Sequence, residues 1–96
     1  MPTFRLTILT PEGPVFQEDV KHVSAPGWDG GFGVLASHAP MVAVLRPGRV
    51  AVRRGDTIRD FYVEDGIVEI RDNRMTLLAS RATAAPVPPP HDTRPQ

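Results

Sequence analysis

"FRLTILTPEGP" (residues 4–14) contains one complete strand pattern together with the turn that ends it. Phe4, Leu6 and Ile8 alternate with polar neighbours, which is the two-residue period of a strand with one buried face. The residues from Thr10 to Pro14 then break the pattern with two prolines and a glycine. This stretch predicts a half-buried β-strand followed by a tight turn.

Similar short runs of alternating or β-branched residues recur along the chain, each bounded by turn residues. They lie at residues 20–25, 32–35, 41–45, 49–54, 57–63, 67–70 and 74–79. The links are mostly two to four residues long, so most neighbouring strands are expected to pair antiparallel as hairpins. Many short strands at close spacing predict an all-β sandwich or barrel. The "RGD" at residues 54–56 is interpreted as the turn of one such hairpin.

Each sheet of such a fold buries one face against the other, which predicts a core from the apolar positions of the runs. The predicted core consists of Leu6, Ile8, Phe16, Val23, Phe32, Val34, Val50, Val52, Phe61, Val63, Val68, Ile70, Met75 and Leu77.

Composition limits the possible functions. The chain has 96 residues, which suits a single domain with a modest core. Eleven basic and eleven acidic residues give a net charge of zero, which disfavours nucleic-acid binding and predicts that partner affinity changes little with salt. Without cysteine there is no disulfide or thiol nucleophile, and the histidines lack zinc-ligand spacing. No apolar stretch has the length needed to cross a bilayer, so no direct membrane insertion is expected.

The C-terminal residues differ from the rest in composition. Residues 84–96 carry five prolines, which exclude helix interiors and central strands. We therefore expect a β-domain over residues 1–83 and a disordered proline-rich tail over 84–96. "PVPPP" (86–90) could serve a proline-binding module, but a solvated tail is the simpler interpretation.

"GWDGGFGVLASHAP" (residues 27–40) is the glycine-rich segment of the chain. A phosphate cradle is disfavoured because no lysine or helix follows the glycines. Ser37 and His38 are neighbours in an extended segment, so their side chains are expected to point apart, which disfavours a triad with Asp29. Trp28 lies within the loop, where it either contacts a partner or caps the sandwich. The segment is interpreted as a surface for another protein.

Taken together, the motifs resemble the N-terminal domain of the epsilon subunit of bacterial F-type ATP synthase, over about residues 4–82. The matching residues are Thr10-Pro11-Glu12-Gly13, Val15-Phe16, Gly27, Gly30, Phe32-Gly33-Val34-Leu35, His38-Ala39-Pro40, Pro47-Gly48 and the stretch 64–79. The resemblance implies a ten-stranded antiparallel β-sandwich in the central stalk, with no catalytic, metal, nucleotide or cofactor site. It implies a location at the cytoplasmic face of the bacterial inner membrane, held there through the ATP synthase complex.

The resemblance also implies two contact sets and two partners. Trp28, Asp29, Gly30 and Gly31 would contact the c-type rotor ring. His38, Ala39, Pro40 and Met41 would contact the gamma subunit. The chain would then hold gamma on the ring and couple ion translocation to ATP synthesis.

Three positions depart from the family pattern. Gly31 replaces a residue that is often acidic, and Glu64-Asp65-Gly66 replaces a serine-glycine-glycine turn. The proline-rich end stands where the family continues into a helical hairpin, so we expect neither the inhibition of ATP hydrolysis nor the ATP binding associated with that hairpin.

Two other functions remain open: a free-standing β-sandwich interaction module outside the ATP synthase, and a small hydrolase using His38. In the hydrolase, His38→Ala would abolish activity, whereas in the coupling subunit it would only weaken assembly.

Overall fold

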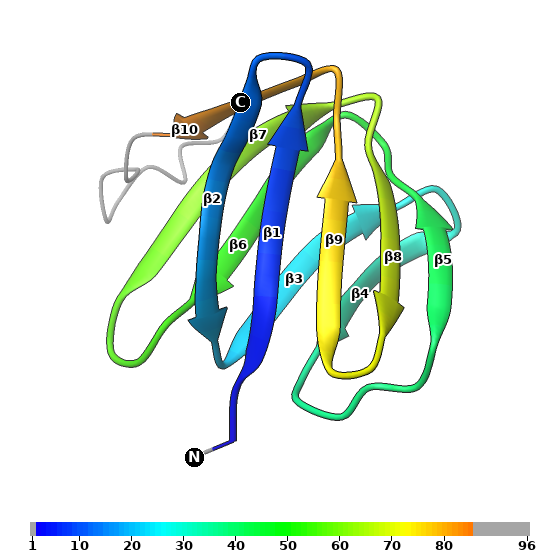
Figure 1. Cartoon of the computed structure of the whole chain (residues 1–96). Coiled ribbons are helices and arrows are strands. Elements are labelled where there is room, and N and C mark those ends of the chain that lie inside the picture. The colour runs from blue at the N-terminus through cyan, green and yellow to red at the C-terminus, as the bar shows by residue number, and fades with distance from the viewer. Residues whose placement is uncertain (1, 86–96) are drawn as a thin grey trace, which may run out of the picture.

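The computed structural model describes residues 2–85, and this part of the chain folds into ten β-strands and no helix (Figure 1). In chain order the strands are β1 (Phe4–Thr10), β2 (Gly13–Val20), β3 (His22–Gly27), β4 (Gly30–Val34), β5 (Met41–Val44), β6 (Gly48–Arg53), β7 (Ile58–Glu64), β8 (Ile67–Arg71), β9 (Arg74–Leu78) and β10 (Arg81–Ala85). The all-β prediction is confirmed.

The strands form two five-stranded sheets that pack face to face (Figure 1). Sheet A has the order β2-β1-β9-β8-β5, and sheet B has the order β10-β7-β6-β3-β4. Seven of the eight strand pairings are antiparallel, but β1 and β9 run parallel. The prediction of an antiparallel sandwich is therefore corrected at this one pair. The two strands are not joined by a hairpin, so no turn imposes opposite directions on them.

The predicted core is confirmed at thirteen of its fourteen positions. Phe32 is only partly buried, because β4 is an edge strand. Five further apolar residues belong to the core and were not predicted: Phe4, Val20, Ala25, Leu45 and Ala79.

Several predicted strand boundaries were wrong. The run 20–25 is divided at Lys21, where the chain leaves sheet A at the end of β2 and enters sheet B in β3. The hairpin at "RGD" is confirmed, but its loop spans 54–57 rather than two residues. The last strand reaches Ala85, so the sheet contains two residues that were expected in the tail. Residues 86–96 of the predicted tail lie outside the described part.

The packing of the core can be tested at Phe61. Its side chain is 1% exposed, and its ring packs edge-to-face on Phe16 with 5.3 Å between centroids. We expect Phe61→Ala to lower the free energy of unfolding by about 3–5 kcal/mol because it leaves a cavity. Tyr62→Ala, on the exposed face of the same strand, should cost less than about 1 kcal/mol. Urea unfolding followed by circular dichroism measures both, and equal costs would contradict the described packing.

Candidate functional site

The turn between β3 and β4 presents the residues of the predicted ring contact. Gly27 pairs with Gly30, so Trp28 and Asp29 form a two-residue turn. Gly27 is required by close packing, because a Cβ atom there would lie 2.7 Å from the Gly30 carbonyl oxygen. Gly30 has a φ of 128°, which strongly favours glycine. The glycines therefore fix the position of Trp28 and Asp29 at the tip of the hairpin.

This turn is attached to the end of β5 in the opposite sheet. The Trp28 amide donates to the Val44 carbonyl at 3.0 Å, and the Arg46 amide donates to the Pro26 carbonyl at 2.7 Å. The Arg46 guanidinium lies 5.2 Å from the centre of the Trp28 ring. Trp28 is still 55% exposed. The indole is thus held in place on a surface that is open to a partner.

A groove of about 600 Å³ lies between β4 and β5, the edge strands of the two sheets. It is lined by Trp28, Asp29, Gly30, Phe32, Met41, Val42, Ala43 and Val44. Met41 and Ala43 pair with the core residues Ile70 and Val68, so they share the inward face of sheet A. The lining contains one ionisable side chain, that of Asp29, and is otherwise apolar or glycine.

The groove brings together only part of the two predicted contact sets. Trp28, Asp29 and Gly30 of the ring set meet Met41 of the gamma set. Gly31 instead lines a different hollow, with His22 and Ser24 of β3. His38, Ala39 and Pro40 lie in the segment between β4 and β5, outside the groove lining.

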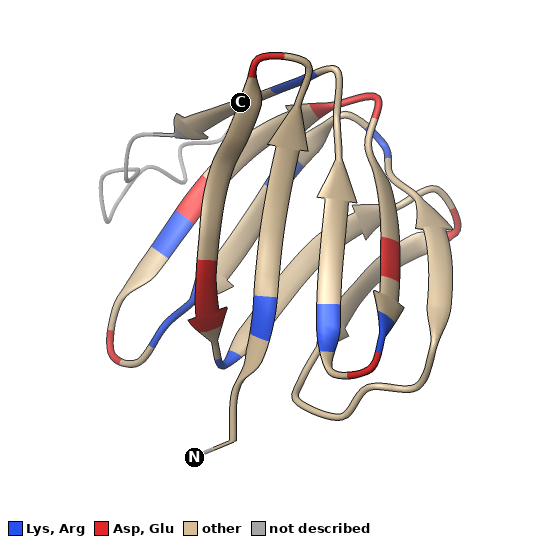
Figure 2. Cartoon of the chain, in the orientation of Figure 1, with Lys and Arg blue, Asp and Glu red and all other residues tan. Residues whose placement is uncertain are grey.

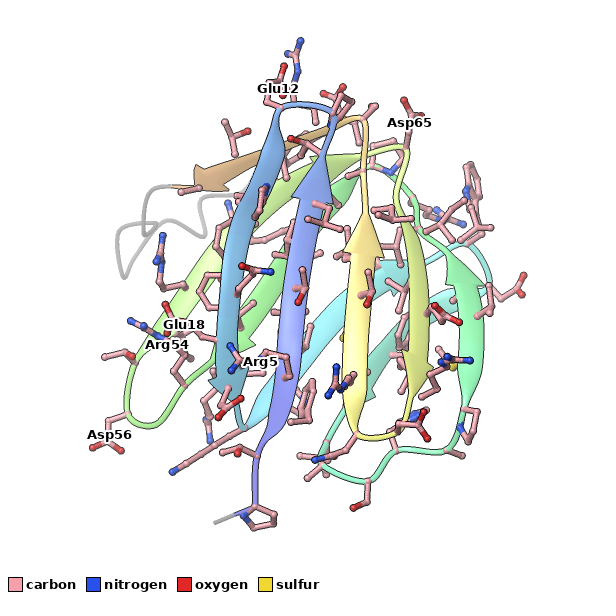
Figure 3. The ribbon with its side chains drawn as sticks, viewed as in Figure 1. Arg5, Glu12, Glu18, Arg54, Asp56 and Asp65 are labelled. Atoms are coloured by element: carbon pink, nitrogen blue, oxygen red, sulfur yellow. The ribbon has the colours of Figure 1, made fainter. Side chains whose placement is uncertain are left out.

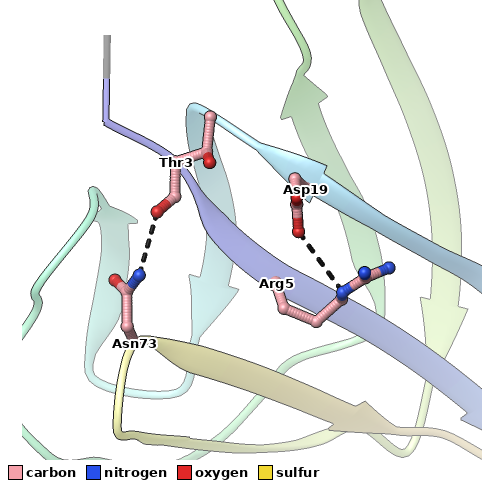
Figure 4. Close-up of polar contacts among 4 residues, drawn as sticks. All are labelled: Thr3, Arg5, Asp19 and Asn73. Carbon is pink, nitrogen blue, oxygen red and sulfur yellow. Dashed lines mark hydrogen bonds and ion pairs between the residues drawn. The ribbon is translucent and has the colours of Figure 1, made fainter.

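Asn73 anchors the segment that contains His38. Its side-chain oxygen accepts from the Ser37 amide at 2.8 Å. Its side-chain nitrogen donates to the Thr3 carbonyl at 2.9 Å, as Figure 4 shows. Ser37 has a φ of 64°, an uncommon conformation for a residue other than glycine. One amide side chain therefore joins the start of β1, the β8–β9 turn and residues 35–40.

Asn73→Gly tests this anchoring role. Asn73 has a φ of 60°, so glycine keeps the turn while removing the amide side chain. We expect the Ser37 amide to exchange with solvent about 10-fold faster, because loss of this hydrogen bond costs roughly 1–2 kcal/mol. Hydrogen exchange measured by NMR gives the rate. Asp72→Gly in the same turn is the control, and an equal rise in both variants would contradict the role of Asn73.

A second surface crosses the outer face of sheet A. Val44 pairs with Ile67, Ile67 with Leu78, Leu78 with Leu9, and Leu9 with Pro14. These five residues form one row across all five strands, which we call the apolar row. Val44, Ile67 and Leu78 are 52%, 47% and 50% exposed, and a hollow of about 360 Å³ lies along Leu9, Ile67 and Leu78.

The arginines on the strands of sheet A lie away from the apolar row, whereas Asp65 of the β7–β8 turn lines the hollow along it. The register places three arginines side by side near the start of β1: Arg71, Arg74 and Arg5. In Figure 2, the ends of β1 and β9 that lie next to the row carry no charged residue. Glu12 and Asp65 lie in turns at the end of the sandwich nearest the row (Figure 3). The strand residues at the row are therefore apolar, with the Asp65 carboxylate at the margin of the row and three arginines at the other end of the face.

Neither the apolar row nor the role of Asn73 is evident from the amino-acid sequence. Each of Leu9, Ile67 and Leu78 looks like an isolated apolar residue at the end of a strand. Their alignment follows from the register and from the parallel β1–β9 pair, neither of which local patterns encode.

Other chemistry has little support in the described residues. The His38 ring Nδ1 lies 2.7 Å from the Ala39 carbonyl, and no hydrogen bond joins it to the Ser37 hydroxyl within residues 2–85. In the same range, no three His, Cys, Asp or Glu side chains gather as metal ligands. The described residues also contain no helix long and apolar enough to span a membrane.

The fold places the chain in the class of two-sheet β-sandwich domains. It belongs to the family described as ATP synthase, Delta/Epsilon chain, beta-sandwich domain, which matches residues 3–85.

Among its relatives, the ATP synthase epsilon chain of Rhodopseudomonas palustris (strain TIE-1) is 46% identical over 86 residues, covering 90% of this chain and 64% of the relative. The epsilon chain of Anoxybacillus flavithermus is 41% identical over 85 residues, covering 88% and 63%. The chain thus spans a little under two thirds of the length of these relatives.

Solved structures share the fold. A chain of the Euglena gracilis mitochondrial ATP synthase (OSCP/F1/c-ring) superposes with a TM-score of 0.81 at 24% identity, covering 88% of this chain and 55% of that chain. A chain from the Tetrahymena thermophila mitochondrial ATP synthase central stalk and c-ring gives 0.72 at 19% identity, covering 81% and 63%. At these identities the likeness concerns the fold.

Proposed function

We propose that this chain is a non-catalytic epsilon subunit of a bacterial F-type ATP synthase, which binds the gamma subunit and the c-type rotor ring. In this role it couples ion translocation to ATP synthesis by holding gamma on the ring. It sits at the cytoplasmic face of the inner membrane through these partners. The apolar row is the observation that carries the proposal, supported by the family membership.

The apolar row has the properties of a protein contact. Apolar side chains align across five strands, with charged residues at the far end of the same face. Contiguous apolar patches on soluble domains commonly mark interaction sites. Burying the row under a partner removes this surface from water, and we assign that partner as gamma. The gamma set of His38 to Met41 extends the contact along the β5 side.

The proposed ring contact adjoins the proposed gamma contact at Val44. This residue belongs to the apolar row, lines the groove and accepts the hydrogen bond from Trp28. This hydrogen bond and the one from the Arg46 amide to the Pro26 carbonyl together form the isolated bridge between Gly27 and Leu45. The turn with Trp28 and Asp29 is therefore attached directly to the strand that contacts gamma. Such a short, rigid connection suits transmission of torque between gamma and the ring.

Affinity purification tests the function. The tagged chain is recovered from detergent-solubilised membranes of its own organism, and co-purifying proteins are identified by mass spectrometry. We expect gamma, the ring subunit and the catalytic subunits. Recovery of the chain alone, or with proteins unrelated to the ATP synthase, would overturn the proposal in favour of a free-standing interaction module.

A further inference from the structure

A further hollow lies where β3, β6 and the residue after β4 meet. Its volume is about 330 Å³, and it is lined by Lys21, His22, Leu35 and Arg53. The Lys21 amide donates to the Arg53 carbonyl at 2.8 Å, and His22 pairs with Arg53 in the register. Leu35 follows β4, whose last residue pairs with Val23. We call these four residues the basic corner.

The basic corner holds cations without an internal counterion. No carboxylate lines it, and within residues 2–85 neither Lys21 nor Arg53 takes part in an ion pair. The adjacent Arg54 differs, because it pairs with Glu18 (Figure 3). The zero net charge of the chain thus conceals a local positive site. A carboxylate placed between Lys21 and Arg53 would meet two cations that have no partner in the fold.

Leu35 places an apolar side chain beside the two cations of the basic corner. Its side chain is 62% exposed and lies beside the cations in the same hollow. A membrane surface is a poor match, since two cations and one leucine offer little charge and only a single apolar side chain. A peptide segment fits better, because two side chains close together in a peptide can supply one carboxylate and one apolar group.

We infer that the basic corner binds an acidic segment of the gamma subunit, with a carboxylate between Lys21 and Arg53 and an apolar side chain on Leu35. This rests on the proposed function, because Leu35 begins the segment that continues to the proposed gamma contact at His38. The Leu35 carbonyl accepts from the His38 amide at 3.2 Å, so the two sites share one turn.

Charge reversal tests the inference. Gamma is titrated with the wild-type chain and with the variant Lys21→Glu/Arg53→Glu, and binding is measured by calorimetry. We expect the variant to bind at least about 10-fold more weakly, through loss of attraction and added repulsion. Arg81→Glu, an exposed reversal outside the basic corner, should bind within about 2-fold of wild type.

A cross-linking experiment needs no change of charge and so does not depend on the folding of that variant. A photoreactive phenylalanine replaces Leu35 in the assembled ATP synthase, and the captured peptide is sequenced. We expect a gamma peptide with Asp or Glu within two residues of the cross-link. Capture of lipid alone, or of a peptide without carboxylates, would overturn the inference. If gamma does not bind the wild-type chain, the proposed function fails as well; if gamma binds wild type and the reversal variant equally, only the basic corner fails.

Discussion

The double substitution Ile67→Asp and Leu78→Asp is expected to lower the affinity for gamma by about 100-fold, which equals about 2.7 kcal/mol. The two side chains are cross-strand neighbours in the middle of the apolar row. Residues near the centre of an interface commonly contribute most of its binding energy. Two carboxylates at this place also have to lose water without gaining partners, which adds to the cost. Calorimetric titration with purified gamma measures the change.

The fold should survive this substitution, because both side chains are about half exposed. Circular dichroism and urea unfolding check this directly. Thr83→Asp is a matched control, since it adds a carboxylate to an exposed position on sheet B. An unchanged affinity in the folded double variant would show that gamma does not bind at the apolar row.

Gly27→Ala is expected to lower the free energy of unfolding by about 2–3 kcal/mol, which is typical of an overpacked interior position. The added methyl group would lie 2.7 Å from the Gly30 carbonyl oxygen and 3.1 Å from the Phe32 ring. The first of these is a backbone atom, so the hairpin itself must shift. Because the shift moves Trp28 and Asp29, binding to the isolated c-ring should weaken in the same variant.

Gly31→Ala provides the control from the same hairpin. A methyl group there would meet only the Ala25 carbonyl, at an ordinary distance of 3.7 Å. We expect a change in stability of less than about 0.5 kcal/mol. Equal losses in the free energy of unfolding for the two variants would contradict the steric explanation for Gly27 and indicate a general effect of replacing glycine.

The sequence predicted those strands whose inward side chains are large and alternate regularly. In β6, Val50 and Val52 are buried as expected. β2 was missed because only Phe16 and Val20 are buried in it, and the register shifts between Ile8 and Leu9 of its partner β1. β10 was not recognised as a strand, and its last two residues were assigned to the tail, because its small residues give no periodic apolar signal.

The candidate site was only partly accessible from the sequence. The glycine-rich segment was correctly interpreted as containing a turn, but the turn consists only of Trp28 and Asp29, because Gly30 and Gly31 belong to β4. That Met41 shares a groove with this turn, while Gly31 faces another hollow, depends on which strands form the sheet edges. The basic corner likewise joins residues 21, 35 and 53, which are distant in sequence and meet only through the β3–β6 pair and the end of β4.

The parallel pair of β1 and β9 has a consequence for biosynthesis. β1 lies between β2 and β9 in sheet A. It can form a hairpin with β2 as soon as both leave the ribosome, but it cannot pair on its other edge until residues 74–78 have been synthesised. Until then the sheet that contains Leu6 and Ile8 is incomplete, and these two apolar side chains are not fully buried. Contacts between such distant residues slow folding, typically to the millisecond-to-second range for β-sandwiches. The nascent chain is therefore expected to be most vulnerable to aggregation and proteolysis just before β9 is released.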